Sequence, residues 1–343
     1  MLNPKAKLSE KIFTKDIEMV ATRQGYGEGL LEAGEKDERV VVLCADLTES
    51  TRSILFKEKF PKRFIEVGVA EQALATLASG MANYGKIPFI SSYAAFSPGR
   101  NWEQIRTTIA LNNVPVKIAG AHAGLTVGPD GATHQMLEDI ALMRAMPNMT
   151  VIAPADAIEA RKATVEAAKN GKPTYIRFAR EKTPVFTTEK TPFKIGRAEI
   201  LWDSTKPITN HQSPITNRVA IITCGPLVYE ALIAAKKLSE GRNKIDCIVI
   251  NSHTIKPLDE ETIVAAAKKT DCVVTVEEHQ ITGGLGGAVA ETLSRNYPVP
   301  QEFIGMPDSF GESGEPDELL KKYKMKAKDI VNAVRRVLKR KKS

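Results

Sequence analysis

The sequence predicts an α/β protein built from two open, mostly parallel sheets. Short runs rich in β-branched residues alternate with helical stretches along most of the chain, and this alternation is typical of parallel sheets with helices on both faces. A polar, proline-bearing segment interrupts the alternation between residues 186 and 217. The length of 343 residues suits two domains, since a single domain commonly holds about 100–200 residues.

The first unit, residues 1–185, is predicted to contain six strands. They fall at residues 40–43, 64–67, 87–90, 116–118, 151–153 and 175–178. Helical stretches lie between them at residues 71–84, 102–112 and 157–169. We expect these elements to form one sheet that is covered on both faces.

Residues 186–217 have no clear period, and the run TKPITN at 205–210 is echoed by SPITN at 213–217. We interpret this segment as a linker with an insertion, because the echo is too short to be a structural repeat.

The second unit, residues 218–343, is predicted to be a smaller α/β domain. Its expected strands lie at residues 219–222, 245–250 and 272–276, with helices beginning at Leu227 and after Pro257.

The positive charge of the protein is concentrated at the C-terminal end. The whole chain carries +7, and residues 321–343, with eleven Lys or Arg and one acid, Asp329, carry +10, so the preceding 320 residues carry −3. The end is amphipathic, with apolar residues at helical spacing at Ile330, Val334, Val337 and Leu338. A terminal helix with a solvated cationic tail is therefore favoured over a phosphate-binding or membrane-surface role, and we predict no nucleic-acid or membrane partner.

Four cysteines lie in or beside apolar runs, without CxxC spacing: Cys44, Cys224, Cys247 and Cys272. They are typical of buried strand residues in a reducing compartment. The N-terminal residues lack the apolar stretch of a signal peptide, and no run reaches the ~18 apolar residues of a membrane span. We therefore expect a cytoplasmic protein.

Glu71 follows the sequence Gly68-Val69-Ala70, where a predicted strand passes into an apolar helix. A glutamate in the first turn of a helix complements the helix dipole, and spacing alone favours that explanation. The other interpretation is functional: a carboxylate at the edge of a sheet, where ligands of open α/β folds bind.

A glycine-rich loop at residues 120–135 contains His122 and His134, two of the five histidines of the chain. Loop histidines shuttle protons or donate hydrogen bonds to developing oxyanions near neutral pH. Although Gly, Pro and Asp are ordinary turn formers, the pair of histidines favours function. A metal site is less favoured, because no cysteine is near and Asp130 does not complete a familiar ligand set; we expect no metal ligands in this chain. The run 136–143 after the loop is predicted to be helical.

Other common nucleotide and hydrolase motifs are missing from the sequence. The run Gly283-Gly284-Leu285-Gly286-Gly287 has Val289 where the dinucleotide-binding fingerprint needs its third glycine. We interpret it as a tight turn before a helix. The sequence also contains no Walker-type phosphate loop and no GxSxG nucleophile elbow.

Five motifs occur in the order and spacing of one family. They are Ala21-Thr22-Arg23, Ala45-Asp46-Leu47, the GVAEQ run at 68–72, Ser92-Tyr93-Ala94-Ala95-Phe96 and the His122/His134 loop. Together they resemble the C-terminal half of transketolase, a thiamine-diphosphate enzyme. The resemblance covers about residues 15–335 and implies a pyrimidine-binding domain followed by the transketolase C-terminal domain.

The resemblance implies roles for eleven residues. Glu71 matches the glutamate at N1′ of the cofactor's aminopyrimidine, Tyr93 and Phe96 match aromatic residues that pack on this ring, and Asp46 and Leu47 match residues that line it. His122 and His134 match histidines that contact sugar oxygens, and Asp130 matches the residue that reads the C2 hydroxyl of the acceptor. Arg23, Ser50 and Arg180 match the sugar-phosphate binders, where an Arg fork suits a phosphate. A glutamate in the role of Glu71 should be poorly solvated.

Two positions depart from the family pattern. Transketolases commonly have Arg at the position of Ala70 and an aromatic residue at that of Gly99, and GVAEQ is closer to deoxyxylulose-phosphate synthase and to 2-oxo-acid dehydrogenase β subunits. The presence of His122 disfavours the assignment to deoxyxylulose-phosphate synthase. One alternative is therefore a subunit of another thiamine-diphosphate enzyme, either deoxyxylulose-phosphate synthase or a 2-oxo-acid dehydrogenase. A second alternative is a non-catalytic assembly or nucleic-acid-binding protein that uses the basic end.

No GDG motif occurs in the sequence, although enzymes of this family bind the cofactor diphosphate through a divalent cation at such a motif. The resemblance therefore implies a separate N-terminal subunit that binds Mg²⁺ or Ca²⁺ with the diphosphate. It also implies a heterotetramer of α2β2 type, sugar-phosphate substrates and a place in the pentose phosphate pathway. The expected activity is transfer of a two-carbon ketol unit from a ketose phosphate to an aldose phosphate.

Overall fold

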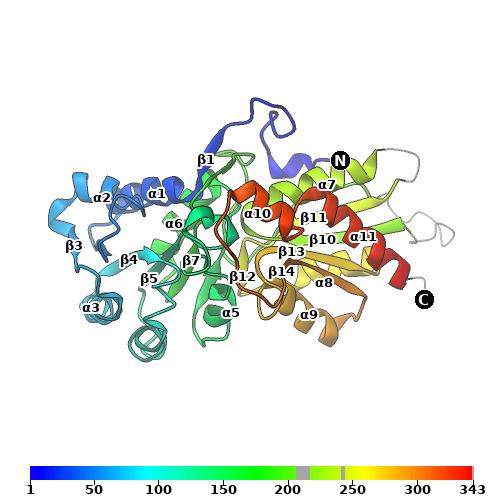
Figure 1. Ribbon diagram of the computed structural model, residues 1–343. Coiled ribbons are helices and arrows are strands. Elements are labelled where there is room, and N and C mark those ends of the chain that lie inside the picture. The colour runs from blue at the N-terminus through cyan, green and yellow to red at the C-terminus, as the bar shows by residue number, and fades with distance from the viewer. Residues whose placement is uncertain (206–216, 241–243, 342–343) are drawn as a thin grey trace.

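The computed structural model describes residues 1–205, 217–240 and 244–341. Two open α/β sheets lie side by side in these residues, as Figure 1 shows. The predicted α/β class with two mostly parallel sheets is confirmed. The insertion that we expected near residue 210 and the last two residues of the basic tail lie outside the described residues.

The first sheet has seven strands in the order β12-β6-β7-β5-β4-β2-β3. Six are mutually parallel: β2 (Val40–Cys44), β3 (Phe64–Glu66), β4 (Ile87–Tyr93), β5 (Lys117–Ala121), β6 (Thr150–Ile152) and β7 (Thr174–Arg177). The seventh, β12 (Thr254–Lys256), comes from the second unit of the chain and pairs antiparallel with β6. Each parallel strand is followed by a loop at the same edge of the sheet, and this edge carries the site described below.

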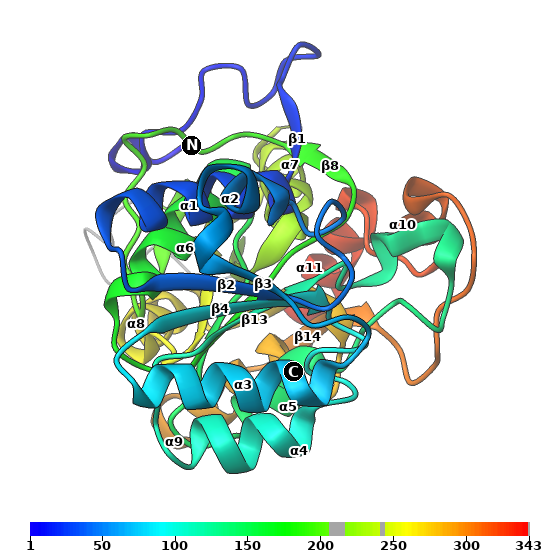
Figure 2. The ribbon, with the colours of Figure 1, turned by 90° about the vertical axis from the view of Figure 1, so that its left-hand side faces the viewer.

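Helices cover both faces of the first sheet (Figure 2). Successive residues of a strand pack against opposite layers. Phe89 of β4 belongs to the core beneath α1 (Thr22–Lys36) and α6 (Ala157–Lys169), and Ile90 belongs to the opposite core. The opposite layer is formed by α3 (Glu71–Asn83), α4 (Trp102–Gln104), the π-helical turn η3 (Ile105–Ala110) and α5 (Asp139–Arg144). This alternation is the expected result of a strand that is buried on both faces.

The second sheet has the order β14-β13-β10-β11-β9. Its parallel strands are β10 (Arg218–Thr223), β11 (Asp246–Asn251), β13 (Val273–Gln280) and β14 (Gln301–Met306). The edge strand β9 (Glu199–Asp203) pairs antiparallel with β11, so the segment that we expected to be a linker contains a strand. Its apolar residues, Ile200-Leu201-Trp202, form a short run.

Four helices cover the second sheet. The helices α7 (Val228–Ser239) and α11 (Ala327–Lys341) pack on one face, and α8 (Glu260–Thr270) and α9 (Leu285–Asn296) on the other (Figure 1). The core beneath α8 and α9 is continuous with the core beneath α3 and α5. The two domains therefore share one buried apolar layer.

The remaining elements are short. They are η1 (Pro4–Ala6), the antiparallel pair β1 (Met19–Ala21) and β8 (Lys182–Pro184), α2 (Ile54–Lys59), η2 (Pro61–Arg63), η4 (Leu125–Asp130), η6 (Gly225–Leu227) and α10 (Pro316–Lys322). The helix that we predicted at residues 136–143 begins only at Asp139. Met136 forms a β-bridge with Ala123 instead, and Gly124 N donates to Met136 O at 2.9 Å.

The predicted C-terminal helix is confirmed, with its four apolar residues buried. Part of its positive charge is compensated, because Arg336 and Arg340 form ion pairs with Glu302 of β14. The glycine run is also a turn before a helix, as predicted, since Gly284 is the N-cap of α9. All four cysteines are buried and carry free thiols. Among the described helices, none has the length and apolar character of a membrane span.

Candidate active site

The residues singled out in the first domain lie at the carboxyl ends of its parallel strands. Asp46 follows β2, Glu71 follows β3, Tyr93 ends β4, His122 follows β5, and Arg180 follows β7. Because carboxyl ends of parallel strands meet at one edge, these residues are brought to the same side of the sheet. Asp46 and His122 also have left-handed backbone angles, with φ of 57° and 53°, a conformation that is uncommon for residues other than glycine.

Glu71 is the first residue of α3 and is only 2% exposed. Its Oε2 accepts a hydrogen bond from Arg100 Nη1 at 2.9 Å, and its backbone carbonyl accepts one from Asn101 Nδ2 at 2.8 Å. The other carboxylate oxygen, Oε1, has a long contact of 3.5 Å from Ser92 Oγ. The expected poor solvation of Glu71 is confirmed, and Oε1 is the oxygen less engaged by protein groups.

Two aromatic rings and two imidazoles form a contiguous cluster beside Glu71. Tyr93 stacks on His122 with the ring centroids 3.9 Å apart, and Phe96 lies 6.0 Å from Tyr93. The ring of His134 meets Phe96 edge to face at 5.5 Å. The guanidinium of Arg100 lies over Phe96 at 5.4 Å, which joins the cluster to Glu71. Four residues from two separate sequence motifs therefore make one surface.

His122 is buried, and its Nδ1 has no hydrogen-bond partner among the described residues. Burial lowers the pKa of His122 to about 3, and the positive charges of Arg23 and Arg180 add to this effect. The imidazole is therefore neutral at physiological pH. A neutral imidazole with an unpartnered buried nitrogen is suited to a hydrogen bond with a ligand.

The two arginines form a positive region next to the histidines. Arg23 Nη1 donates to Ser50 O at 2.9 Å, and Arg180 Nη1 donates to Val127 O at 2.7 Å. Burial, followed by the neighbouring Arg52, lowers the pKa of Arg23. Arg180 Nη1 also lies 3.7 Å from Glu181 Oε1. Two neighbouring guanidinium groups are suited to an anionic ligand.

The remaining predicted residues lie on the rim. Asp46 is exposed and Leu47 is half-buried, and the turn is held by Glu66, whose Oε1 accepts from Asp46 N at 2.7 Å. Asp130 is exposed at the end of η4, and its side chain makes no hydrogen bond or ion pair with a described residue. The structure therefore places Asp130 on the loop of the histidines but does not connect its carboxylate with their rings.

Sequence reasoning missed Arg100 and Asn101, which hold Glu71. Their only sequence signal is their place one turn after Phe96 in the segment that follows β4. It also missed Glu278, which lies two residues after Val276 in β13 and contacts the histidine loop. The unusual sequence Glu277-Glu278-His279 at the end of an apolar strand could have drawn attention to it.

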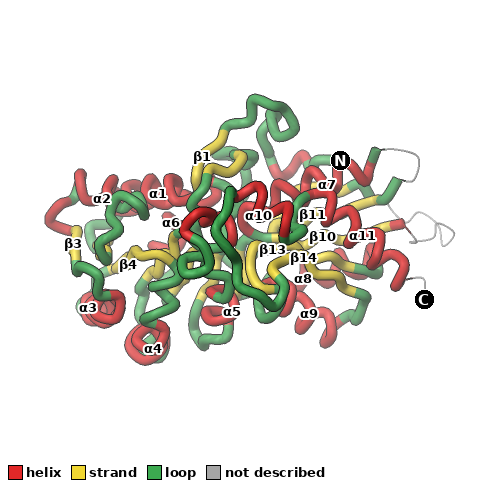
Figure 3. The backbone as a smooth tube through the Cα atoms, in the orientation of Figure 1, coloured by secondary structure: helices red, strands yellow, loops and turns green. Residues whose placement is uncertain are grey.

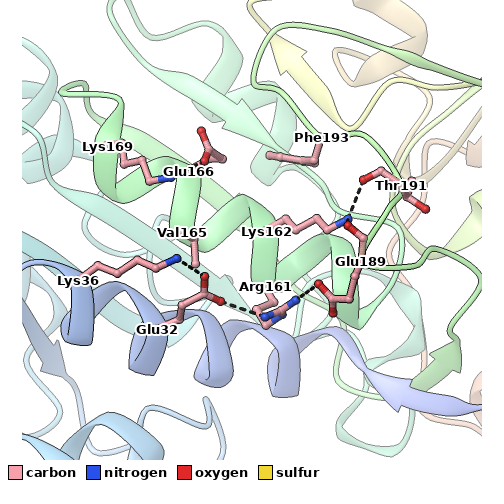
Figure 4. Close-up of a pocket in the computed structure, with 10 residues that line it drawn as sticks. All are labelled: Glu32, Lys36, Arg161, Lys162, Val165, Glu166, Lys169, Glu189, Thr191 and Phe193. Atoms are coloured by element: carbon pink, nitrogen blue, oxygen red, sulfur yellow. Dashed lines mark hydrogen bonds and ion pairs between the residues drawn. The ribbon is translucent and has the colours of Figure 1, made fainter. Parts of the chain in front are cut away.

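A separate cavity of about 390 Å³ lies between α1 and α6, away from this edge (Figure 4). Its charged groups are already paired: Arg161 bridges Glu32 and Glu189, and Lys162 donates to three backbone carbonyls. We therefore regard this cavity as a structural feature. Among the described residues, no group of three or more His, Cys, Asp or Glu side chains is placed to hold a metal ion.

Comparison with known proteins identifies the family. Residues 18–185 match the model of the transketolase pyrimidine-binding domain, and residues 209–330 match that of the transketolase C-terminal domain. The chain is 44% identical over 321 residues to a putative transketolase C-terminal section from Methanocaldococcus jannaschii, which covers 93% of this chain and 96% of that protein. The chain belongs to the transketolase family.

Two further relatives agree with this assignment. A 6-deoxy-6-sulfo-D-fructose transketolase subunit from Clostridium sp. (strain MSTE9) is 39% identical, over 93% of this chain and 95% of that protein. A solved structure described as a split-gene transketolase, inactive beta4 tetramer, has a TM-score of 0.83 and 42% identity, and covers 93% of this chain and 99% of that one. This transketolase chain therefore corresponds to the C-terminal section of the family, whose domains imply the use of thiamine diphosphate.

Proposed function

We propose that this transketolase subunit transfers a two-carbon ketol unit from a ketose phosphate to an aldose phosphate at a site that it shares with a separate N-terminal subunit. The observation that carries the proposal is the cluster of Tyr93, Phe96, His122 and His134 beside the buried carboxylate of Glu71. It combines a surface for an aromatic ring with groups that bind sugar oxygens.

The residues of this chain fit the aminopyrimidine part of thiamine diphosphate. The orphaned Nδ1 of His122 and the lightly engaged Oε1 of Glu71 both lie at the cluster. In the proposed complex, Phe96 and Tyr93 pack on the pyrimidine ring, Asp46 and Leu47 line it, and Glu71 holds a proton at its N1′ nitrogen. The cofactor, when bound, supplies the nucleophilic carbon for ketol transfer.

The rest of the loop and the two arginines would bind the sugars. His122, which stays neutral, and His134 hydrogen-bond to the carbonyl and hydroxyl oxygens of the substrate. Asp130 reads the C2 hydroxyl of the acceptor. Arg23 and Arg180, with Ser50, bind the phosphate, since a guanidinium pairs with two phosphate oxygens at once.

The partner subunit would bind the diphosphate through Mg²⁺ or Ca²⁺. Two observations support a shared site: the sequence lacks a GDG motif, and the rim residues Asp46 and Asp130 are exposed. Self-association to an α2β2 heterotetramer is supported by Leu77 and Leu111, apolar side chains that are 50% and 74% exposed. They lie on and just after the neighbouring helices α3 and η3. We place the enzyme in the cytoplasm and in pentose phosphate metabolism.

The experiment reconstitutes the chain with its N-terminal partner subunit and measures ketol transfer between a ketose phosphate and an aldose phosphate. Glu71→Ala is expected to leave assembly intact and to lower the rate by about 10³ or more, whereas Glu103→Ala, an exposed residue of the nearby α4, leaves the rate unchanged. Unchanged activity in Glu71→Ala would contradict the proposal. Pyruvate consumption without ketol transfer would instead favour a deoxyxylulose-phosphate synthase or an oxo-acid dehydrogenase β subunit.

A further inference from the structure

Glu278 connects the second domain to the loop that carries His122 and His134. It lies in β13, is 2% exposed, and its Oε1 accepts a hydrogen bond from Thr126 N at 2.6 Å. The two residues are 152 positions apart in the sequence. A carboxylate of the C-terminal domain therefore contacts the backbone of a loop of the pyrimidine-binding domain.

This carboxylate caps the helical turn η4 inside the loop. The N-cap position of η4 is Gly124, which has no side chain to accept from the first amides, and the turn has no side-chain cap of its own. An unpaired buried amide is costly, so a turn of this kind needs an acceptor from elsewhere. Glu278 supplies this acceptor through its Oε1.

Gly124 and Glu278 fit each other closely. A Cβ atom at Gly124 would lie 2.4 Å from Glu278 Oε1, and Gly124 has a φ of 94°, which disfavours any other residue. The backbone of Glu278 is held in turn by Arg177, whose Nη2 donates to Glu278 O at 2.7 Å and whose Nε pairs with Asp139 at 2.8 Å. The capping carboxylate thus projects from a strand that is anchored to the first sheet.

The C-terminal domain holds the same loop at a second point. Gln135 Nε2 donates to Leu125 O at 3.1 Å and to Glu312 O at 2.9 Å. Glu312 belongs to the loop between β14 and α10, which crosses the junction of the two sheets (Figure 3). Both ends of the segment between His122 and His134 are therefore restrained by the second domain.

We propose that Glu278 is a positioning residue of the ketol-transfer site: it fixes the loop so that His122 and His134 keep the geometry in which they bind sugar oxygens. This inference rests on the proposed function for its catalytic consequence. The loop restraint itself is a property of the free chain and is measured without activity.

The adjacent residue offers a matched control. Glu277 is 1% exposed and caps the start of α9, with Leu285 N and Gly286 N each 2.7 Å from its carboxylate oxygens. Glu277 and Glu278 therefore share burial, residue type and a helix-capping role. They differ in the helix that they cap: Glu277 caps α9, whereas Glu278 caps η4 in the histidine loop.

The experiment measures amide hydrogen exchange of residues 123–137 in the full chain. Glu278→Ala is expected to accelerate exchange in this segment about tenfold or more, because capping bonds restrain local opening. Glu278→Gln keeps an acceptor oxygen for Thr126 N, and Oε2, which Gln replaces by an amide, has no partner among the described residues. We therefore expect exchange close to that of the unmodified chain. Glu277→Ala should accelerate exchange at the start of α9 and leave residues 123–137 unchanged.

Ketol transfer by the reconstituted complex is the second readout. Glu278→Ala should raise the KM for the sugar phosphates about tenfold, with rescue by Glu278→Gln and unchanged binding of thiamine diphosphate. Loop exchange that is unaffected by Glu278→Ala would overturn the inference. Faster loop exchange with unchanged KM would overturn its catalytic part, whereas a lack of ketol transfer in the unmodified complex would contradict the proposed function alone.

Discussion

Arg100 Nη1 lies 2.9 Å from Glu71 Oε2, although the Arg100 side chain is half exposed and the Glu71 side chain is buried. The pair joins the first residue of α3 to the segment after β4, and Arg100 also lies over the ring of Phe96. The guanidinium thus holds one carboxylate oxygen of Glu71 and leaves the other facing Ser92. Arg100 defines which oxygen of Glu71 is available to a ligand.

Removing Arg100 should destabilise the protein and weaken its activity. Arg100→Met leaves a buried carboxylate without its cation, and we expect a loss of about 1–3 kcal/mol in the free energy of unfolding, between the values typical of exposed and buried pairs. Urea denaturation measures this loss. Arg106→Met, at an exposed arginine of η3, is the control and should change stability by less than about 0.5 kcal/mol. Equal stability of both variants would show that the pair contributes nothing.

The low pKa of His122 predicts how activity depends on pH. Because burial and two arginines lower this pKa to about 3, His122 stays neutral as the pH falls from 8 to 5 and does not cause an acid limb near pH 6.5. His122→Asn should therefore lower ketol transfer by about 10² without moving the acid midpoint of the pH–rate profile. Loss of an acid limb near pH 6.5 in this variant would show that His122 titrates in the working range.

Glu159 predicts a pH dependence of stability. It is buried, accepts from Ala155 N at 2.6 Å and from Asn251 Nδ2 of the second domain at 2.8 Å, and burial together with Asp156 raises its pKa to about 8. The folded protein then keeps a proton that the unfolded chain releases near pH 4.5, so stability falls as the pH rises between these values.

Glu159→Gln removes this dependence. The free energy of unfolding of the Glu159→Gln variant minus that of the unmodified protein should increase as the pH rises. The increase is about 1.4 kcal/mol per pH unit between the two pKa values. Urea denaturation at about pH 5, 6.5 and 8 measures the difference. A difference that is constant over this range would mean that Glu159 is ionised in the folded protein.

The exposed leucines predict a self-association surface. Figure 2 shows α3 and α4 side by side on one face of the first sheet. Leu77 of α3 and Leu111, directly after η3, have exposed side chains. Leu77→Lys with Leu111→Lys should lower the assembly mass measured by light scattering, because burial of an ammonium group opposes association. Phe310→Lys, at another exposed apolar residue, should leave the mass unchanged. An unaltered mass in the double variant would place the interface elsewhere.

Much of the fold and the site could be predicted from local sequence patterns. The period of the apolar runs predicted the six parallel strands of the first sheet and the helix α11, and the position of Glu71 after a strand predicted its place in the first turn of α3. Strands β1, β8, β9, β12 and β14 were missed. Their apolar runs are short, and they form because neighbouring strands offer them unpaired backbone groups.

By itself, the sequence determined the α/β class, the buried cysteines, the amphipathic C-terminal helix and the motif set that resembles transketolase, since each depends on residue types at short spacing. The tertiary structure alone decided that Arg100 pairs with Glu71, that Tyr93 stacks on His122, and that Glu278 caps the histidine loop. These contacts join residues 29 to 152 positions apart. Strand order and register bring such atoms together, and no local period of the sequence encodes which residues will meet.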